Sequence, residues 1–144
     1  MEPPTWASWG SLEPAVRNGT VPFKDANGMM IFDYYAQHPE SAQPFNEFMS
    51  FFSSGEIPIV QQMFDWSQYD GKVVMDIGGS LGPVPAAIKE AAPGIARCIN
   101  FDLPEVIESI SEPFPGVENV AGDMFDPSTL PKADCVFMKH ILHD

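Results

Sequence analysis

The stretch VVMDIGGSLG, residues 73–82, decides the fold of this chain. An apolar run ends at Asp76, and Gly78, Gly79 and Gly82 follow closely. A short apolar run bounded by turn residues is typical of a buried strand. Glycine lets the backbone turn sharply and lets a ligand approach without a Cβ in the way. The pattern fits a nucleotide-binding turn between a strand and a helix. Its spacing, D-x-G-G-S-x-G, is not G-x-G-x-x-G, so a plain strand–helix connection stays open from these residues alone.

Strands and helices alternate after this turn. Apolar runs predict strands, and amphipathic runs between them predict helices. The expected strands are residues 72–77, 96–102, 117–123 and 134–139, and the expected helices are residues 83–92 and 104–110. This order predicts an α/β fold with a parallel sheet of about four strands and flanking helices. Such a sheet binds ligands beyond the carboxyl ends of its strands.

The first 70 residues are predicted to form a separate helical segment that precedes the α/β domain of residues 71–144. Helices are expected at residues 29–37, 41–53 and 59–66, with Gly55 and Pro58 breaking the chain between the last two. Phe45, Phe48 and Met49 recur with Phe52 at i, i+3, i+4 and i+7, which gives the second helix one apolar face. That face either packs into a core or lines a pocket for a flat aromatic ligand.

Composition excludes several classes of function. Seven Lys and Arg stand against 20 Asp and Glu, for a formal net charge of −13. This balance argues against nucleic acid and against an anionic membrane surface as partners. Cys98 and Cys135 lie in apolar runs, as buried reduced thiols do. The N-terminus has no signal-peptide pattern and no apolar stretch is long enough to span a membrane, so a cytoplasmic location is expected.

Polar residues close each predicted strand, and the parallel arrangement would bring them to one rim. Asp102 follows the last glycine of the turn by 102 − 82 = 20 residues, where a carboxylate can accept ribose hydroxyls. It could equally cap the helix that begins near Pro104. Asp123 and Met124 end the third strand and would suit an adenine ring, or a turn and a core residue.

The last residues carry the candidate base. His143 could serve as a general base near neutral pH. His140 and His143 stand three residues apart and could share a metal ion, but no third ligand with metal-like spacing is evident. No metal is therefore expected.

Four blocks, VMDIGGSLG, INFDLPEVI, PGVENVAGDMF and FMKHILHD, occur here in the order and spacing of a known family. The chain resembles the S-adenosylmethionine-dependent small-molecule O-methyltransferases of the plant and fungal caffeate and flavonoid type. The upstream segments FDYYAQHPE and FNEFM are similar to that family too, so the resemblance covers nearly the whole chain.

The resemblance implies a partial Rossmann-like methyltransferase fold with strand order 3-2-1-4 and S-adenosylmethionine as cofactor. By matching position, Gly78 would line the methionine portion, Asp102 would hold the ribose, and Lys139 would contact the methionyl end. Asp123 and Met124 would contact the adenine. His143 would deprotonate the hydroxyl of a small phenolic acceptor, whose pocket Phe45 and Met49 would line.

The chain also departs from the family. Ser80 stands where the family usually has glycine, His140 replaces a common tryptophan, and Phe52 replaces a histidine of many plant members. Family members carry an N-terminal helical dimerisation domain and continue beyond the His-Asp pair, so this chain is expected to be a piece truncated at both ends. Homodimerisation belongs to the full-length family. Two readings stay open: an active O-methyltransferase, and a non-catalytic fragment that keeps the cofactor site.

Overall fold

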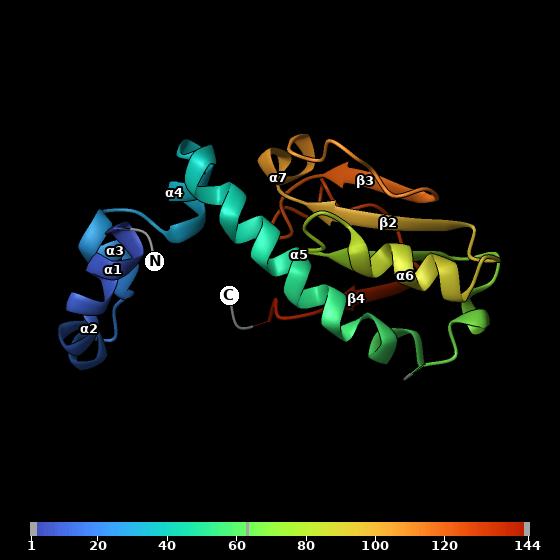
Figure 1. Ribbon diagram of the computed structural model, residues 1–144, viewed down its shortest axis with the longest axis horizontal. Helices are drawn as coiled ribbons and strands as arrows, with labels where there is room; N and C mark the ends of the chain where they lie inside the picture. The colour runs from blue at the N-terminus through green and yellow to red at the C-terminus, as the bar shows by residue number, and fades with distance from the viewer. Residues whose placement is uncertain (1–2, 63, 143–144) are drawn as a thin grey trace. The chain divides into compact units, whose positions relative to one another are not determined.

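A computed structural model describes residues 3–62 and 64–142 (Figure 1). These residues fall into two compact units, one within Met1–Phe45 and the other within Asn46–Asp144. The boundary predicted from the sequence, between residues 70 and 71, is a different one. It marks where the cofactor-binding domain is predicted to start, and it stays a prediction. Within the described ranges no helix is long and apolar enough to cross a membrane.

The first unit consists of short helices. They are α1 (Pro3–Gly10), α2 (Leu12–Asn18), α3 (Pro22–Asn27) and α4 (Ile31–Gln37). The Asn27 side chain on α3 donates to the Pro4 carbonyl of α1 at 3.2 Å, and Phe23 is buried. Gly19 and Gly28 end α2 and α3 in the left-handed conformation, at φ +66° and +81°, as helix-terminating glycines commonly do.

Helix α5 (Pro39–Gln62) is longer than the sequence predicts. Gly55 and Pro58 were expected to end a helix near residue 53, yet the helix runs through both. Proline in a helix interior removes a backbone hydrogen bond. Continuation through Pro58 therefore shows that packing outweighs the local propensity, since Val60 of the last turn is buried in the core of the second unit. A short 3-10 helix, η1 (Trp66–Tyr69), follows.

The second unit is built on a parallel sheet of four strands in the order β3-β2-β1-β4. The strands are β1 (Val73–Ile77), β2 (Arg97–Asp102), β3 (Val117–Ala121) and β4 (Cys135–Met138), and the connecting helices are α6 (Pro83–Ala91) and α7 (Pro104–Glu108). The structure confirms the predicted α/β class and the strand order. Strand ends differ from prediction by only one or two residues.

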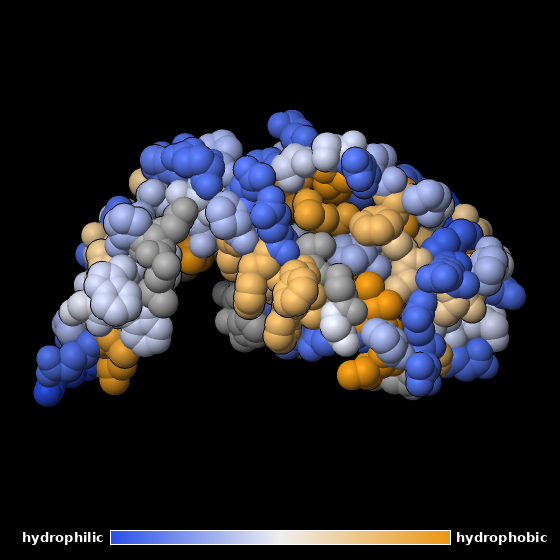
Figure 2. Space-filling model, in the orientation of Figure 1, coloured by the Kyte–Doolittle hydropathy of each residue, from blue (hydrophilic) through white to orange (hydrophobic). Residues whose placement is uncertain are grey.

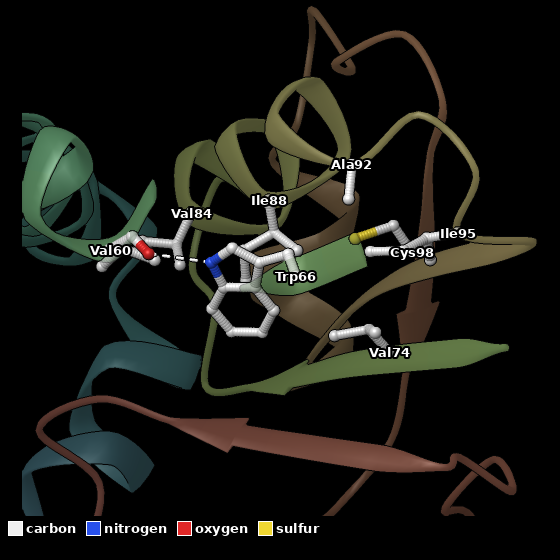
Figure 3. Packing of buried hydrophobic residues seen from close by; sticks show 8 residues of the cluster. All are labelled: Val60, Trp66, Val74, Val84, Ile88, Ala92, Ile95 and Cys98. Atoms are coloured by element: carbon white, nitrogen blue, oxygen red, sulfur yellow. Dashed lines mark hydrogen bonds between the residues drawn. The ribbon is translucent and has the colours of Figure 1, made fainter. Parts of the chain in front are cut away.

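Alternation along β1 and β2 divides the core between the two faces of the sheet. Val74 and Cys98 face α6 and pack with Ile88 and Trp66 (Figure 3). The Trp66 indole N–H donates to the Val60 carbonyl at 2.8 Å, which fixes the end of α5 against this cluster. The opposite face carries a second cluster, formed by Met75, Ile77, Ile99 and Phe101 with the segment after β3 packed on it. This second face is covered only in part, since Val136 of β4, in register with Met75, is exposed.

Candidate functional site

The glycine-rich turn lies at the carboxyl end of β1, between that strand and α6. Gly78 and Gly82 have positive φ angles of +71° and +88°, a region that favours glycine. A Cβ at Gly78 would clash with the Ile141 side chain. The two glycines are therefore required by the turn itself.

Ser80 also has a positive φ angle, +53°, although it is not glycine. Hydrogen bonds fix both its backbone N–H and its backbone carbonyl. The Ser80 N–H donates to Asp102 Oδ2 at 2.8 Å, and its carbonyl accepts from Asn100 Nδ2 at 2.9 Å. The Ser80 hydroxyl oxygen is buried and has no hydrogen-bond partner within residues 3–62 and 64–142.

Asp102 ends β2 and joins it to the turn. Besides the Ser80 N–H, its carboxylate accepts the Leu103 N–H at 2.8 Å. Leu103 precedes α7, which has no side-chain cap, so the helix-capping alternative for Asp102 is not what the structure shows. Burial raises the pKa of Asp102, while these two backbone donors lower it. Each carboxylate oxygen has further lone pairs, so Asp102 retains capacity to accept ligand hydroxyls.

A pocket opens beside the turn. Its cavity volume is about 20 Å³. Its lining combines Asp76, Gly78, Gly79, Ser80 and Val84 with Lys139 from the end of β4 and Met49 and Ser53 from α5. A cavity of this size holds about one water molecule. Its lining nevertheless brings the glycine-rich turn and one cationic side chain together.

Lys139 is paired with a residue that the sequence analysis missed. Its ammonium lies 2.9 Å from Glu56 Oε2 on α5, and His140 Nε2 lies 3.7 Å from the other oxygen. The Lys139 ammonium lowers the pKa of Glu56. Lys139 also lies over the Phe52 ring, at 5.7 Å from its centre. Glu56 follows Met49 and Ser53 at i+7 and i+3, so helical periodicity could have placed it beside the pocket.

Asn100 is a second residue beside the glycine-rich turn that the sequence analysis did not propose. It is fully buried in the middle of β2, in register with Asp76 on β1 and Asn119 on β3. Its side-chain N–H groups donate to the Ser80 carbonyl and to Asn119 Oδ1. A polar residue inside the apolar run RCINFD was the signal available in the sequence. Asn100 therefore stabilises the glycine-rich turn through its hydrogen bond to the Ser80 carbonyl.

Asp123, Met124 and Phe45 are not among the residues that line this pocket. Asp123 is exposed beyond β3, and its carboxylate accepts the Phe125 N–H at 2.8 Å. Met124 packs against the second core cluster. Phe45 lies in the first unit, stacked on Tyr35 at 5.1 Å between ring centres. His143 lies outside the described residues.

The apolar face predicted for α5 is largely exposed (Figure 2). Phe48 is 59% exposed and Phe52 45% exposed, and Phe51 and Ile59 are exposed as well. Core packing therefore does not account for Phe48 and Phe52. Met49, by contrast, is half-buried and lines the pocket.

Metal binding finds no support in the described ranges, where no three His, Cys, Asp or Glu side chains gather closely enough to hold an ion. These side chains instead suit a nucleoside with a charged tail. Asp102 can accept hydroxyls, Lys139 can bind an anion, and the Ser80 hydroxyl has no partner among the described residues. These features fit S-adenosylmethionine, which carries a ribose and an amino-acid carboxylate.

Alanine at position 79 should destabilise the second unit. A Cβ there would clash with Asn100 Oδ1 and lie 3.0 Å from Asp76 Oδ2. Both side chains are buried and Asn100 is fixed by its hydrogen bonds, so neither can move away freely. We expect Gly79→Ala to reduce the free energy of unfolding by about 1–3 kcal/mol, the usual cost of overpacking. Urea denaturation measures it.

The matched control for this substitution is Gly55→Ala, in the exposed interior of α5, where an added Cβ meets nothing within 4 Å. It should leave stability unchanged or raise it by about 0.5–1 kcal/mol. Equal stability of the two variants would show that the turn has room for a side chain at position 79.

The fold and the turn define a class: a Rossmann-like α/β domain with a glycine-rich turn after the first strand and an acidic residue at the end of the second. Comparison with known proteins then identifies the family. A family model for the O-methyltransferase domain matches residues 9–144, so the chain belongs to that family.

Individual relatives agree. The chain is 43% identical over 137 residues to the flavone 3'-O-methyltransferase OMT1 of Chrysosplenium americanum, covering 95% of this chain and 38% of the relative. It is 43% identical over 138 residues to the caffeic acid 3-O-methyltransferase of Medicago sativa, with 95% and 36% covered. The chain thus spans little more than a third of these relatives.

Solved structures show the same fold. The mitomycin 7-O-methyltransferase MmcR is 30% identical with a TM-score of 0.82, and the match covers 99% of this chain and 42% of that one. Human N-acetylserotonin methyltransferase, solved in complex with S-adenosylmethionine, is 26% identical with a TM-score of 0.81, and 97% and 41% are covered. These likenesses confirm the resemblance and the fold class predicted from the sequence.

Proposed function

We propose that this chain binds S-adenosylmethionine and belongs to an enzyme that transfers its methyl group to a hydroxyl of a small phenolic acceptor. One observation carries the proposal. Asp102 at the end of β2 contacts the glycine-rich turn after β1, and that turn lines a pocket together with Lys139 at the end of β4. Three neighbouring strands thus end at the same edge of the sheet. There Asp102 can accept hydroxyls, the glycine-rich turn lets a ligand come close to the backbone, and Lys139 supplies a positive charge.

In this proposal different residues contact different parts of the cofactor. Asp102 accepts the ribose hydroxyls, Lys139 exchanges Glu56 for the amino-acid carboxylate, and Gly78 lets the methionyl portion approach the backbone. Asp123 and Met124 take the adenine. Similar proteins support the cofactor and the acceptor class. Solved structures similar to this chain include complexes with S-adenosylmethionine or S-adenosylhomocysteine, and relatives in sequence are methyltransferases of a flavone or of caffeic acid.

For the chemical step, the cofactor supplies an electrophilic methyl group on its sulfonium. The protein positions the acceptor and removes its proton. We assign proton removal to His143 by its match to the family motif, and assign Phe45 and Met49 to the acceptor pocket on the same ground. A phenol has a pKa near 10, so a neutral imidazole within hydrogen-bond distance would assist at physiological pH.

Calorimetric titration of the 144-residue chain with S-adenosylmethionine tests the proposal. We expect saturable binding with a dissociation constant in the micromolar range. Absence of binding by a chain whose circular dichroism shows it folded would contradict the cofactor assignment. Binding without methyl transfer to caffeic acid or a flavone would support the cofactor site and assign the chain the role of a non-catalytic binding fragment.

A further inference from the structure

Ser80 combines two unfavourable features at one position of the glycine-rich turn. It holds a left-handed φ of +53°, which is costly for a residue with a Cβ. Its buried hydroxyl oxygen lacks a hydrogen-bond partner within the described part of the chain. Buried polar groups are nearly always paired, and backbone strain concentrates at ligand sites. Glycine at this position would avoid both costs.

Two neighbouring side chains impose this backbone conformation on Ser80. Asp102 holds the Ser80 N–H and Asn100 holds its carbonyl, so the Cα–Cβ direction is fixed. Ser80 lines the pocket together with Lys139 and Met49, whereas Asp102, Asp123 and Met124 are not among the lining residues. Ser80 therefore belongs to the lining of the pocket assigned above to the amino-acid end of the cofactor, and not to the residues proposed for its ribose or adenine.

We propose that the Ser80 hydroxyl is a specificity-determining contact of this site, which hydrogen-bonds the amino-acid portion of the bound cofactor. The inference rests on the proposed function. A hydroxyl can donate to a carboxylate and accept from an ammonium, so it suits either charged group of that portion. Ser80 then adds a side-chain contact beside Lys139, whereas the other turn residues that line the pocket are Gly78 and Gly79.

Two ligands separate this role from a structural one. S-adenosylhomocysteine carries the amino-acid portion, and 5'-methylthioadenosine keeps the adenine, ribose and sulfur but lacks it. We expect Ser80→Ala to weaken S-adenosylhomocysteine about fivefold to tenfold, as the loss of one hydrogen bond would. Its affinity for 5'-methylthioadenosine should change less than twofold. Ser80→Gly should show the same ligand pattern and a raised melting temperature, because it also removes the strain.

Both affinities are measured by calorimetry on the full chain, with melting temperatures to confirm folding. Equal losses for the two ligands, or no loss for either, would overturn the assignment of Ser80. If the unsubstituted chain binds neither ligand, the proposed function itself fails. If it binds S-adenosylhomocysteine and Ser80→Ala binds it equally well, only the present inference fails.

Discussion

Replacing Asp76 by asparagine is expected to make the second unit more stable at alkaline pH and to leave its stability nearly unchanged below about pH 4. Asp76 is 3% exposed near the carboxyl end of β1. Burial raises its pKa from an ordinary 3.8 to about 8, and nearby Asp102 adds to this increase while Lys139 opposes it. The native protein therefore favours the protonated, neutral side chain, which asparagine mimics in shape.

The sign follows from proton linkage. Because the folded-state pKa exceeds the unfolded value, the folded state binds more protons between about pH 4 and pH 8. Its stability is full below pH 4 and falls as the pH rises to about 8, above which it levels off. At about 1.4 kcal/mol per pH unit, the difference reaches on the order of 6 kcal/mol at most, and relaxation around the ionised carboxylate will reduce it.

Urea denaturation at pH 5, 7 and 9 measures the effect. The difference in unfolding free energy between Asp76→Asn and the unsubstituted chain should grow with pH and favour the variant. Glu112→Gln, which removes an exposed carboxylate from the loop before β3, is the matched control and should show no such trend. A difference that is constant across this range would mean that Asp76 titrates normally in the folded protein.

Much of the second unit could be predicted from the sequence because its signals are local. Apolar runs such as KVVMDI mark strands buried on both faces, and the glycines after Asp76 mark the turn that follows. Once the strands are parallel, their carboxyl ends share a rim, and Asp102, Gly78 and Lys139 follow from chain order alone. In the structure Gly78 and Lys139 line one pocket, and Asp102 contacts the turn that contains Gly78.

What could not be predicted depends on contacts between distant segments. The path of α5 through Gly55 and Pro58 contradicts local propensity and is decided by the packing of Val60 against the sheet. The pairing of Glu56 with Lys139 joins residues 83 positions apart (139 − 56 = 83) and leaves no motif in the sequence. The significance of the Ser80 hydroxyl comes from its burial and from the two neighbours that fix the backbone of Ser80, which no local pattern in the sequence indicates.

Replacing Asp102 by alanine is expected to weaken S-adenosylmethionine binding by about 1.5–3 kcal/mol, which is roughly 10- to 150-fold in dissociation constant. A hydrogen bond to a charged group contributes about this much. The variant loses the proposed acceptor of the ribose hydroxyls and also frees the N–H groups of Ser80 and Leu103, which the carboxylate now holds. Both effects act in the same direction, since a looser turn binds less well.

Asp102→Asn separates the two effects because the amide oxygen can still accept the Ser80 N–H. If Asp102 contacts the ribose, both Asp102 variants should weaken S-adenosylhomocysteine and 5'-methylthioadenosine alike, because both ligands keep the ribose. Ser80→Ala, by contrast, should discriminate between them. Glu105→Ala, an exposed change in the first turn of α7, serves as the control and should bind normally. Unaltered affinity in a folded Asp102→Ala variant would contradict the ribose assignment. Asp102 would then only stabilise the turn, and another residue would bind the ribose.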